Sequence, residues 1–284
     1  AIEPPAHTRL RRLTEKAFTA HRVKELEPRI RQIVADLIES RADAGGCDGM
    51  TDIAGPLTAH LICEQLGFDW EEVGPEKVAR WTDAVLAQIG RMQTREAMIE
   101  NAKVMCELQN FIIRYIEARE KEPREDMISD IVHAELADTD NPKLSREEQI
   151  STIRGFLIAG NDTTAAGITN VLLVLATNPD LAEALYPQVD NDRVMSRFVE
   201  EVLRLQPPVH GLFRTAMKDV ELGGVTVPAM AQLCVLYASA NRDEAKFPDA
   251  GQLYIDRPNV GANLSFGLGI HKCVVIALVR MEIK

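Results

Sequence analysis

The chain has 284 residues, a formal net charge of −11, 46% hydrophobic residues and 26% charged residues. This composition is typical of a globular protein with a sizeable core. The acidic balance argues against nucleic acid or a polybasic membrane contact as the main partner. We find no apolar run of about 18 residues, so we expect no membrane-spanning helix. The first residues lack the basic and apolar regions of a signal peptide, so we expect none.

The cysteines are odd in number, far apart and never spaced Cys-x-x-Cys. They are Cys47, Cys63, Cys106, Cys234 and Cys273. This usage argues against a disulfide framework and a structural zinc site, and it favours a reducing compartment such as the cytoplasm. One of the five could be exceptional, and we expect the other four to be core thiols.

Most of the chain has the apolar spacing of amphipathic helices. Ser145 followed by Glu148 forms a capping-box pattern at the start of an unusually long helix, and Asn178-Pro179 predicts its end. The expected helices cover residues 7–17, 23–41, 52–66, 76–89, 94–119, 127–135 and 145–177, a stretch from 181, and residues 194–205.

After Gln206-Pro207-Pro208 the pattern changes to short alternating segments. These predict strands over 213–217, 220–222, 225–227 and 232–237, with Gly223-Gly224 as a hairpin turn. A Gly-rich loop and an apolar helix over 274–284 follow. We therefore expect a mainly α chain with a small β region, as one domain over 1–284 with a helical core in 1–206 and a β and loop part in 207–284.

The most distinctive motif is Phe266-Gly-Leu-Gly-Ile-His271-Lys-Cys273. The two glycines allow a backbone to pass close to a flat or bulky group. A cysteine at the start of a helix lies near positive partial charge, which stabilises a thiolate. Such a thiolate could be a nucleophile, a metal ligand or simply a structural cysteine in a turn.

A second motif, Ala159-Gly-Asn-Asp162-Thr163-Thr164, lies inside the long apolar helix. These residue types are poor helix formers, and their side chains can capture backbone groups. We therefore expect a local break beside a binding space, where Asp162 and Thr163 could relay protons. A simple kink or a polar contact between helices is the structural alternative.

Two further pairs have helical spacing. Glu201 and Arg204 lie three residues apart, as in many surface ion pairs. His7 and Arg11 lie four residues apart on one face and could hold a carboxylate or remain solvated.

Taken in order, these motifs resemble the cytochrome P450 haem-thiolate monooxygenases of the bacterial soluble type. The matching segments are Pro-Pro-x-His-Thr-Arg-Leu-Arg-Arg from Pro4, Ala-Gly-x-Asp-Thr-Thr, Glu-x-x-Arg and Phe-Gly-x-Gly-x-His-x-Cys. The resemblance covers essentially the whole chain. It departs at Val275, Ile276 and Ala277, where the family usually has Gly, a small residue and Pro. We expect Val275 to crowd the proximal face of a haem or to shift the helix.

The resemblance implies haem b as cofactor and Cys273 as the thiolate ligand of its iron. It implies Asp162 and Thr163 as the acid–alcohol pair that delivers protons, with Ala159 and Gly160 leaving room over the haem. The remaining implied haem contacts are Phe266, Gly267 and Gly269 around the sulfur, and His7, Arg11, Arg214 and His271 as partners of the propionates.

The resemblance also implies a buried structural cluster of Glu201, Arg204 and Arg257. The implied substrate contacts are apolar, which favours an apolar substrate. They are Phe156, Val209, Leu212 and Phe213. A substantial segment before Pro4-Pro5 and another after the cysteine helix are present in such proteins, so we expect this chain to be the central part of a longer domain.

The implied function is insertion of one oxygen atom of O₂ into a small apolar organic substrate. Electrons would come from NAD(P)H through a ferredoxin and ferredoxin reductase, because Gly267-Leu-Gly269 does not continue into a dinucleotide-binding motif. The alternatives are a peroxide-driven haem enzyme and a haem-free P450-like scaffold that only binds. We expect a cytoplasmic protein with no nucleic-acid or membrane partner.

Overall fold

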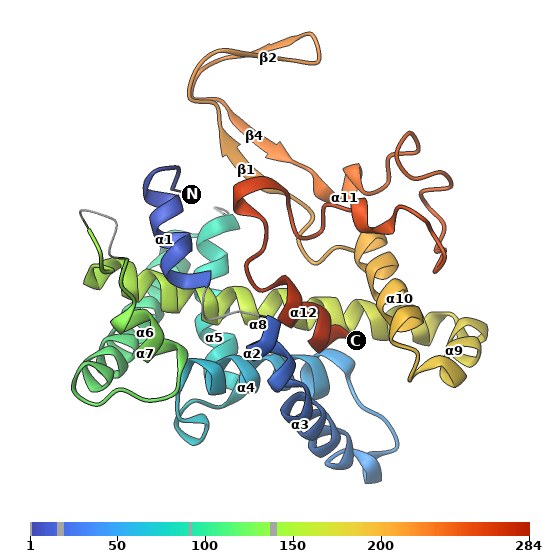
Figure 1. The fold of residues 1–284 in the computed structure, drawn as a ribbon, viewed down its shortest axis with the longest axis horizontal. Coiled ribbons are helices and arrows are strands. Elements are labelled where there is room, and N and C mark those ends of the chain that lie inside the picture. The colour runs from blue at the N-terminus through green and yellow to red at the C-terminus, as the bar shows by residue number, and fades with distance from the viewer. Residues whose placement is uncertain (1, 16–19, 91–92, 137–140) are drawn as a thin grey trace. The chain divides into compact units, whose positions relative to one another are not determined.

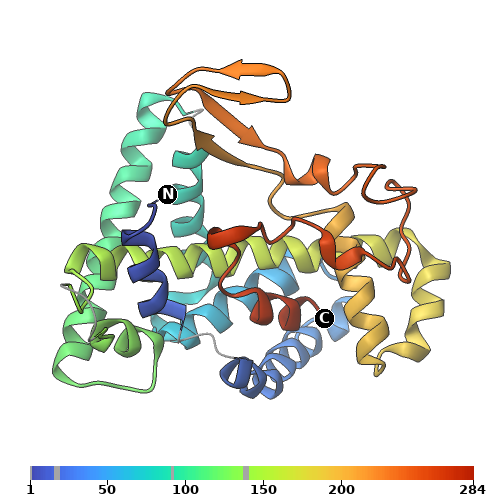
Figure 2. The same cartoon turned by 45° about the horizontal axis from the view of Figure 1, so that its top comes forward.

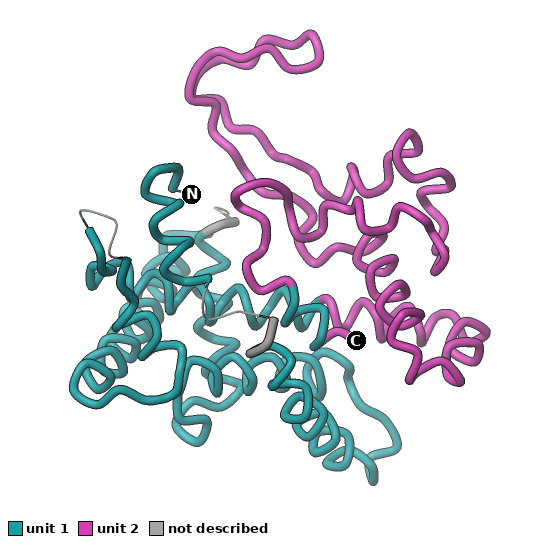
Figure 3. Tube along the Cα trace, viewed as in Figure 1, with its two compact units in different colours: residues 1–166, 277–282 teal, residues 167–276, 283–284 magenta. Residues whose placement is uncertain are grey.

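The computed structural model describes residues 2–15, 20–90, 93–136 and 141–284, which form two compact units (Figure 3). Unit 1 comprises Ala1–Ala166 and Ala277–Glu282, and unit 2 comprises Gly167–Ile276 and Ile283–Lys284. The architecture is mainly helical with two small sheets, which confirms the expected fold class (Figure 1). Among the described residues, no helix has the length and apolarity needed to cross a bilayer.

Unit 1 is built from helices around one apolar core. α5 packs against α4 and α6, and α6 also packs against α7 (Figure 2). Trp81, Ile112 and Ile116 are fully buried in this core, and Phe111 packs beside Trp81 with ring centroids 4.9 Å apart. The helices of unit 1 are α1 (Ala6–Thr14), α2 (Ala20–Glu25), α3 (Glu27–Glu39), α4 (Gly55–Leu66), α5 (Trp70–Gly90), α6 (Arg95–Lys121), α7 (Met127–His133), the part of α8 (Arg146–Thr177) up to Ala166 and residues 277–282 of α12 (Ile276–Ile283).

Some helix boundaries differ from those that the periodicity predicts. The single helix expected over 23–41 is two helices, α2 and α3, because Pro28 lacks an amide hydrogen and suits the first turn of a new helix. The helix expected from residue 52 begins with a π-helical turn, Gly49–Ala54, before α4. α5 begins earlier than expected and contains a kink at Gly74, where φ is +64°. Residues 16 and 17 of the first expected helix lie outside the described residues.

The start of α8 confirms the capping box. The Ser145 amide donates to Glu148 Oε2 at 2.8 Å, and the Glu148 amide donates to Ser145 Oγ at 3.2 Å. These reciprocal bonds satisfy amides that the first turn of a helix cannot satisfy internally. The helix ends at Thr177, as the following Asn178-Pro179 predicts.

Unit 2 contains α9 (Pro179–Leu185), α10 (Asp192–Leu205) and two antiparallel strand pairs. β1 (Leu212–Thr215) pairs with β4 (Gln232–Val235), and β2 (Val220–Leu222) pairs with β3 (Val225–Val227). Gly223 and Gly224 have φ of +57° and +79°, so the predicted two-residue hairpin turn is confirmed.

The last predicted strand is too long, because Tyr237 begins the short helix α11 (Tyr237–Ala240). The terminal helix α12 (Ile276–Ile283) begins two residues later than predicted.

Candidate active site: the cysteine loop and the polar segment of α8

The cysteine loop of unit 2 is held by its own backbone. The Cys273 amide donates to the Phe266 carbonyl at 2.9 Å, and the Lys272 amide donates to the Gly269 carbonyl at 3.1 Å. Gly267 and Gly269 have φ of +69° and +75°, a conformation that residues with a Cβ rarely adopt. The two predicted glycines are therefore required by the turn that folds Cys273 back beside Phe266.

Cys273 is a half-buried thiol three residues before α12, which begins at Ile276. A partly accessible sulfur on a backbone-constrained loop suits ligation of a haem iron, because the ligand must reach the metal without rearranging the loop. The residues present therefore fit the cofactor. Val275 is buried in the structure, with 9% of its surface exposed.

The other cysteines correct one expectation. Of the four expected in the core, only Cys63 is buried, and burial raises the pKa of its thiol to about 12. Cys47, Cys106 and Cys234 are exposed. Cys106 lies on α6 and Cys234 on β4, whereas Cys47 lies in the loop before the π-helical turn.

The polar segment of α8 lies in unit 1 and does not break the helix. α8 is helical from Arg146 to Thr177, so the expected break at Ala159–Thr164 is wrong. The expected capture of a backbone group does occur, because Thr163 Oγ donates to the Ala159 carbonyl at 2.8 Å. This bond to the carbonyl one turn earlier lets a threonine remain inside a helix.

Asp162 is half-buried beside Thr163. Burial raises the pKa of its carboxyl, and the nearby Asp83 carboxylate raises it further. Both effects disfavour the charged form. A carboxyl that takes up a proton more readily than usual, next to a hydroxyl, has the chemistry of a proton relay.

The small residues before this pair have different surroundings. Ala159 is exposed, whereas Gly160 faces α4. A Cβ at Gly160 would lie 3.0 Å from Ile62 Cδ1, which is tighter than ordinary contact. The missing side chain of Gly160 thus permits a close approach of α8 to α4.

Asn161, to which the sequence assigns no individual role, makes the polar contact between helices that is the structural alternative for this motif. It is buried and hydrogen bonded to two threonines of other helices, Thr58 of α4 and Thr82 of α5. The available signal was an amide followed by Asp-Thr in an apolar helix, with threonines in two further apolar helices. That signal does not reveal which of them meet.

Glu201, Arg204 and Arg257 form one buried ion cluster in unit 2. Arg204 donates to both carboxylate oxygens of Glu201 at 2.8 Å, and Arg257 Nε donates to Oε1 at 2.9 Å. Burial raises the pKa of Glu201, but bonds from Arg204, the Tyr254 amide and Arg257 outweigh it and hold the pKa below its usual value. The i,i+3 spacing of Glu201 and Arg204 suggests an exposed ion pair. In the structure, the side chains of Glu201, Arg204 and Arg257 are all buried.

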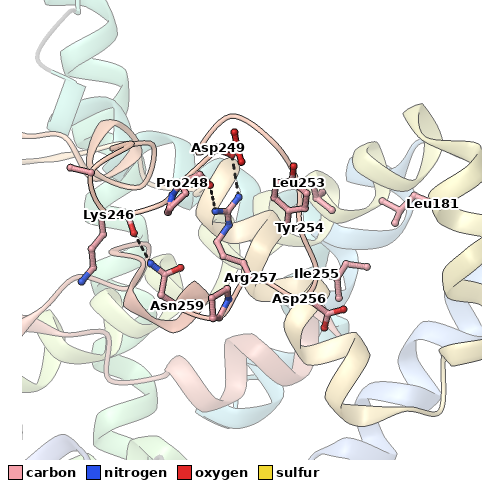
Figure 4. Close-up of a pocket in the computed structure, with 12 residues that line it drawn as sticks. Leu181, Lys246, Pro248, Asp249, Leu253, Tyr254, Ile255, Asp256, Arg257 and Asn259 are labelled. Carbon is pink, nitrogen blue, oxygen red and sulfur yellow. Dashed lines mark hydrogen bonds between the residues drawn. The ribbon is translucent and has the colours of Figure 1, made fainter.

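Backbone carbonyls supply the remaining partners of the two guanidinium groups. Arg257 donates to the Pro248 and Asp249 carbonyls at 2.7 and 3.2 Å, which fixes the irregular stretch around it (Figure 4). The same stretch lines an open surface hollow of about 910 Å³. This cluster therefore organises the chain that leads to the cysteine loop.

The other predicted haem contacts lie on α1 and in unit 2. His7 and Arg11 lie on one face of α1, and Arg11 is within 3.7 Å of Glu15. Arg214 lies on β1 and donates to the Phe213 carbonyl at 2.9 Å. His271 lies in the 3₁₀ turn of the cysteine loop.

The predicted substrate contacts have mixed exposure. Phe156 is partly buried against the core of unit 1. In unit 2, Val209 is half-buried, while Leu212 and Phe213 are exposed on β1. The structure thus places one of these side chains in unit 1 and three in unit 2.

Comparison with known proteins places this chain among similar sequences. The sequence profile described as Cytochrome P450 matches residues 91–284. A 6-deoxyerythronolide B hydroxylase of Saccharopolyspora erythraea is 34% identical over 99% of this chain and 66% of its own length. A mycinamicin IV hydroxylase/epoxidase of Micromonospora griseorubida is 34% identical over 100% of this chain and 69% of its own length. The chain thus spans about two thirds of these curated relatives.

Solved structures agree with the sequence matches. P450BioI in complex with an acyl carrier protein ligated to hexadec-9Z-enoic acid superposes with a TM-score of 0.91 at 29% identity, covering 99% of this chain and 71% of that one. CYP109E1 of Bacillus megaterium in complex with testosterone has a TM-score of 0.88 at 30% identity, covering 99% and 72%. By profile, sequence and fold, this chain belongs to the cytochrome P450 family of haem b oxidoreductases.

Proposed function

We propose that the protein is a monooxygenase that inserts one oxygen atom of O₂ into a small apolar organic substrate, as a single catalytic domain. The cysteine loop carries this proposal, since it presents a thiol on a backbone held by glycines. Bound haem would supply the oxygen-activating chemistry, with Cys273 as its thiolate ligand. The names of the two hydroxylase relatives support the reaction class.

Asp162 and Thr163 are the proton-handling pair in this proposal. Thr163 is anchored to the Ala159 carbonyl, and Asp162 has a raised pKa. The carboxyl can therefore exchange protons with water while the hydroxyl passes them on. His7, Arg11, Arg214 and His271 supply cations and hydrogen-bond donors for the two haem propionates, which would be costly to bury without them.

The substrate side is assigned to Phe156, Val209, Leu212 and Phe213. Their apolar side chains favour a hydrophobic substrate. Among the relatives, the solved complexes contain testosterone and a fatty acyl carrier protein, and MycG was solved with mycinamicin V. Testosterone, hexadec-9Z-enoic acid and mycinamicin V are therefore suitable probes.

Electrons would arrive from NAD(P)H through a ferredoxin and its reductase. Lys272 precedes Cys273 in the sequence and is exposed, as a basic contact for an acidic ferredoxin requires. All five cysteines are thiols, which fits the reducing environment of the cytoplasm.

The spectrum of the reduced, carbon monoxide-treated protein tests the proposal. We expect a Soret band shifted strongly to the red, as thiolate ligation produces, and its loss in Cys273→Ser. The exposed Cys234→Ser is the matched control and should keep the band. A wild-type protein that stays colourless after haem reconstitution would contradict the proposal and favour a haem-free scaffold. Testosterone, hexadec-9Z-enoic acid and mycinamicin V are then added separately to the ferric protein. The probe that shifts the Soret band identifies the substrate class.

A further inference from the structure

Asn161 occupies a buried crossing of three helices in unit 1. Thr58 Oγ of α4 lies 2.9 Å from its Oδ1, and Thr82 Oγ of α5 lies 3.3 Å from its Nδ2. The exposed fractions of Thr58 and Thr82 are 0% and 1%, so water does not compete for these bonds. In such surroundings, a side-chain amide that lost its partners would be costly.

The side-chain chemistry shows why an amide suits this position. The Thr58 hydroxyl has one proton and three acceptors within reach, which are Asn161 Oδ1 and the Ala54 and Gly55 carbonyls. An amide carries both donors and an acceptor, so it can bond a threonine on each side in either orientation. A carboxylate could only accept, and it would bury a charge. Leucine could form neither bond.

The backbone next to Asn161 is held equally closely. Gly160 allows α8 to approach α4 until a Cβ would meet Ile62. Successive residues of an α-helix are separated by about 100°, so Thr163 lies on nearly the opposite face from Asn161. A helix fixed by Asn161 on one face thus presents Thr163 at a fixed rotation on the other.

The same helix α5 also shapes the electrostatics of this segment. Asp83 follows Thr82, and its carboxylate acts on Asp162. The threonine bond and this charge come from adjacent residues of α5. A shift of α5 would therefore change both at once.

We propose that Asn161, bonded to Thr58 and Thr82, is a positioning residue that sets the rotation and depth of Asp162 and Thr163. This inference rests on the proposed monooxygenase function, because the pair it positions is the proton-handling pair. Asn161 itself touches no reacting atom. Its contribution is the bridging of α8 to α4 and α5.

Two measurements on the haem-loaded full chain test this role. The first is hydrogen–deuterium exchange of residues 158–166. We expect Thr82→Val to accelerate it by about threefold to tenfold, as the loss of one hydrogen bond predicts, and Asn161→Leu, which loses two, to accelerate it by at least as much. The second is peroxide released per NADPH oxidised, with a plant-type ferredoxin, its reductase and testosterone. Misplacement of Thr163 should raise this ratio by about twofold or more.

The chain offers a matched control and a rescue. Asn170, also on α8, donates one bond to the Gln206 carbonyl at 2.9 Å, so Asn170→Leu loses a comparable bond away from Asp162. We expect Asn170→Leu to leave both the exchange of residues 158–166 and the peroxide ratio unchanged. Thr82→Ser keeps the hydroxyl and should restore both values to those of the wild type.

The outcomes separate the two proposals. If Asn161→Leu and Thr82→Val lower the melting temperature but leave exchange of 158–166 and the peroxide ratio unchanged, the positioning role is overturned. If exchange rises but the peroxide ratio does not, the network holds the helix without positioning the pair, and the inference is also overturned. A wild-type protein without the red-shifted carbon monoxide band instead overturns the proposed function. Hydrogen–deuterium exchange of residues 158–166 then tests by itself whether Asn161 holds α8.

Discussion

Arg204 lies one helical turn after Glu201 on α10 and donates two hydrogen bonds of 2.8 Å to its carboxylate, with both side chains fully shielded from solvent. Two more bonds link Arg204 to the Asn241 and Ala250 carbonyls at 2.8 and 2.7 Å. The guanidinium group therefore joins α10 to chain segments about 40 residues later. An ion pair with the common i,i+3 spacing therefore anchors the irregular stretch that contains Asn241 and Ala250.

Removal of Arg204 should destabilise the fold strongly. Arg204→Ala leaves the Glu201 carboxylate buried with one of its two cationic partners missing, and breaking a buried pair costs about 3–5 kcal/mol. We expect a loss of this size in the free energy of unfolding in urea. The exposed pair Arg31–Glu27 is the control, and Arg31→Ala should change stability little. Similar effects for the two variants would contradict the assigned burial of the cluster.

Removal of the Thr163 hydroxyl should uncouple oxygen consumption from product formation. Thr163→Ala keeps the helix but loses the group next to Asp162, so we expect more peroxide per NADPH and less product. Thr177 forms the same kind of bond, with its Oγ 2.7 Å from the Leu173 carbonyl, at the far end of α8. Thr177→Ala should therefore leave coupling unchanged. Unchanged coupling in Thr163→Ala would remove Thr163 from the proton-handling pair.

Glu282 should make stability depend on pH. Burial raises the pKa of this carboxyl to about 8, and the Thr164 hydroxyl opposes part of that rise. Between the ordinary value of 4.5 and about 8, the unfolded chain has released a proton that the folded chain retains. Stability therefore falls as pH increases through this window, by up to about 1.4 kcal/mol per pH unit.

Glu282→Gln removes this titration and tests it. The variant should gain stability relative to the wild type as pH increases from about 5 to 8, and the difference should level off above that range. The free energy of unfolding at several pH values measures this difference. Glu117→Gln, an exposed change on α6, should leave the pH dependence as it is. Parallel pH curves for the wild type and Glu282→Gln would show that folding does not raise the pKa of Glu282.

Two glycines of α8 should respond differently to alanine. A Cβ at Gly155 would meet nothing within 4 Å, so Gly155→Ala should stabilise the helix by up to about 1 kcal/mol. At Gly160 the added Cβ would crowd Ile62, which offsets the helical gain. Urea unfolding should therefore show a smaller gain, or a loss, for Gly160→Ala. Equal gains at the two positions would mean that α4 and α8 do not approach closely at Gly160.

The sequence determined most helices because their apolar residues repeat with the helical period, and this local signal survives in the fold. It also determined the capping box of Ser145 and Glu148 and the turn at Gly223-Gly224, which depend on neighbouring residues alone. Two of the errors have identifiable causes. Pro28 restarts a helix inside one apolar stripe, and the poor helix formers of residues 159–164 remain helical because α8 is long and packed.

The ordered motifs determined the family, because spacing along the chain is enough to identify them. Only the tertiary structure decided which polar residues meet. Glu201 and Arg257 are 56 residues apart and Asn161 and Thr58 are 103 apart, and no periodicity links such positions. Burial is the physical reason these contacts matter, since a polar group shielded from water needs a partner, and packing alone determines which partner it finds.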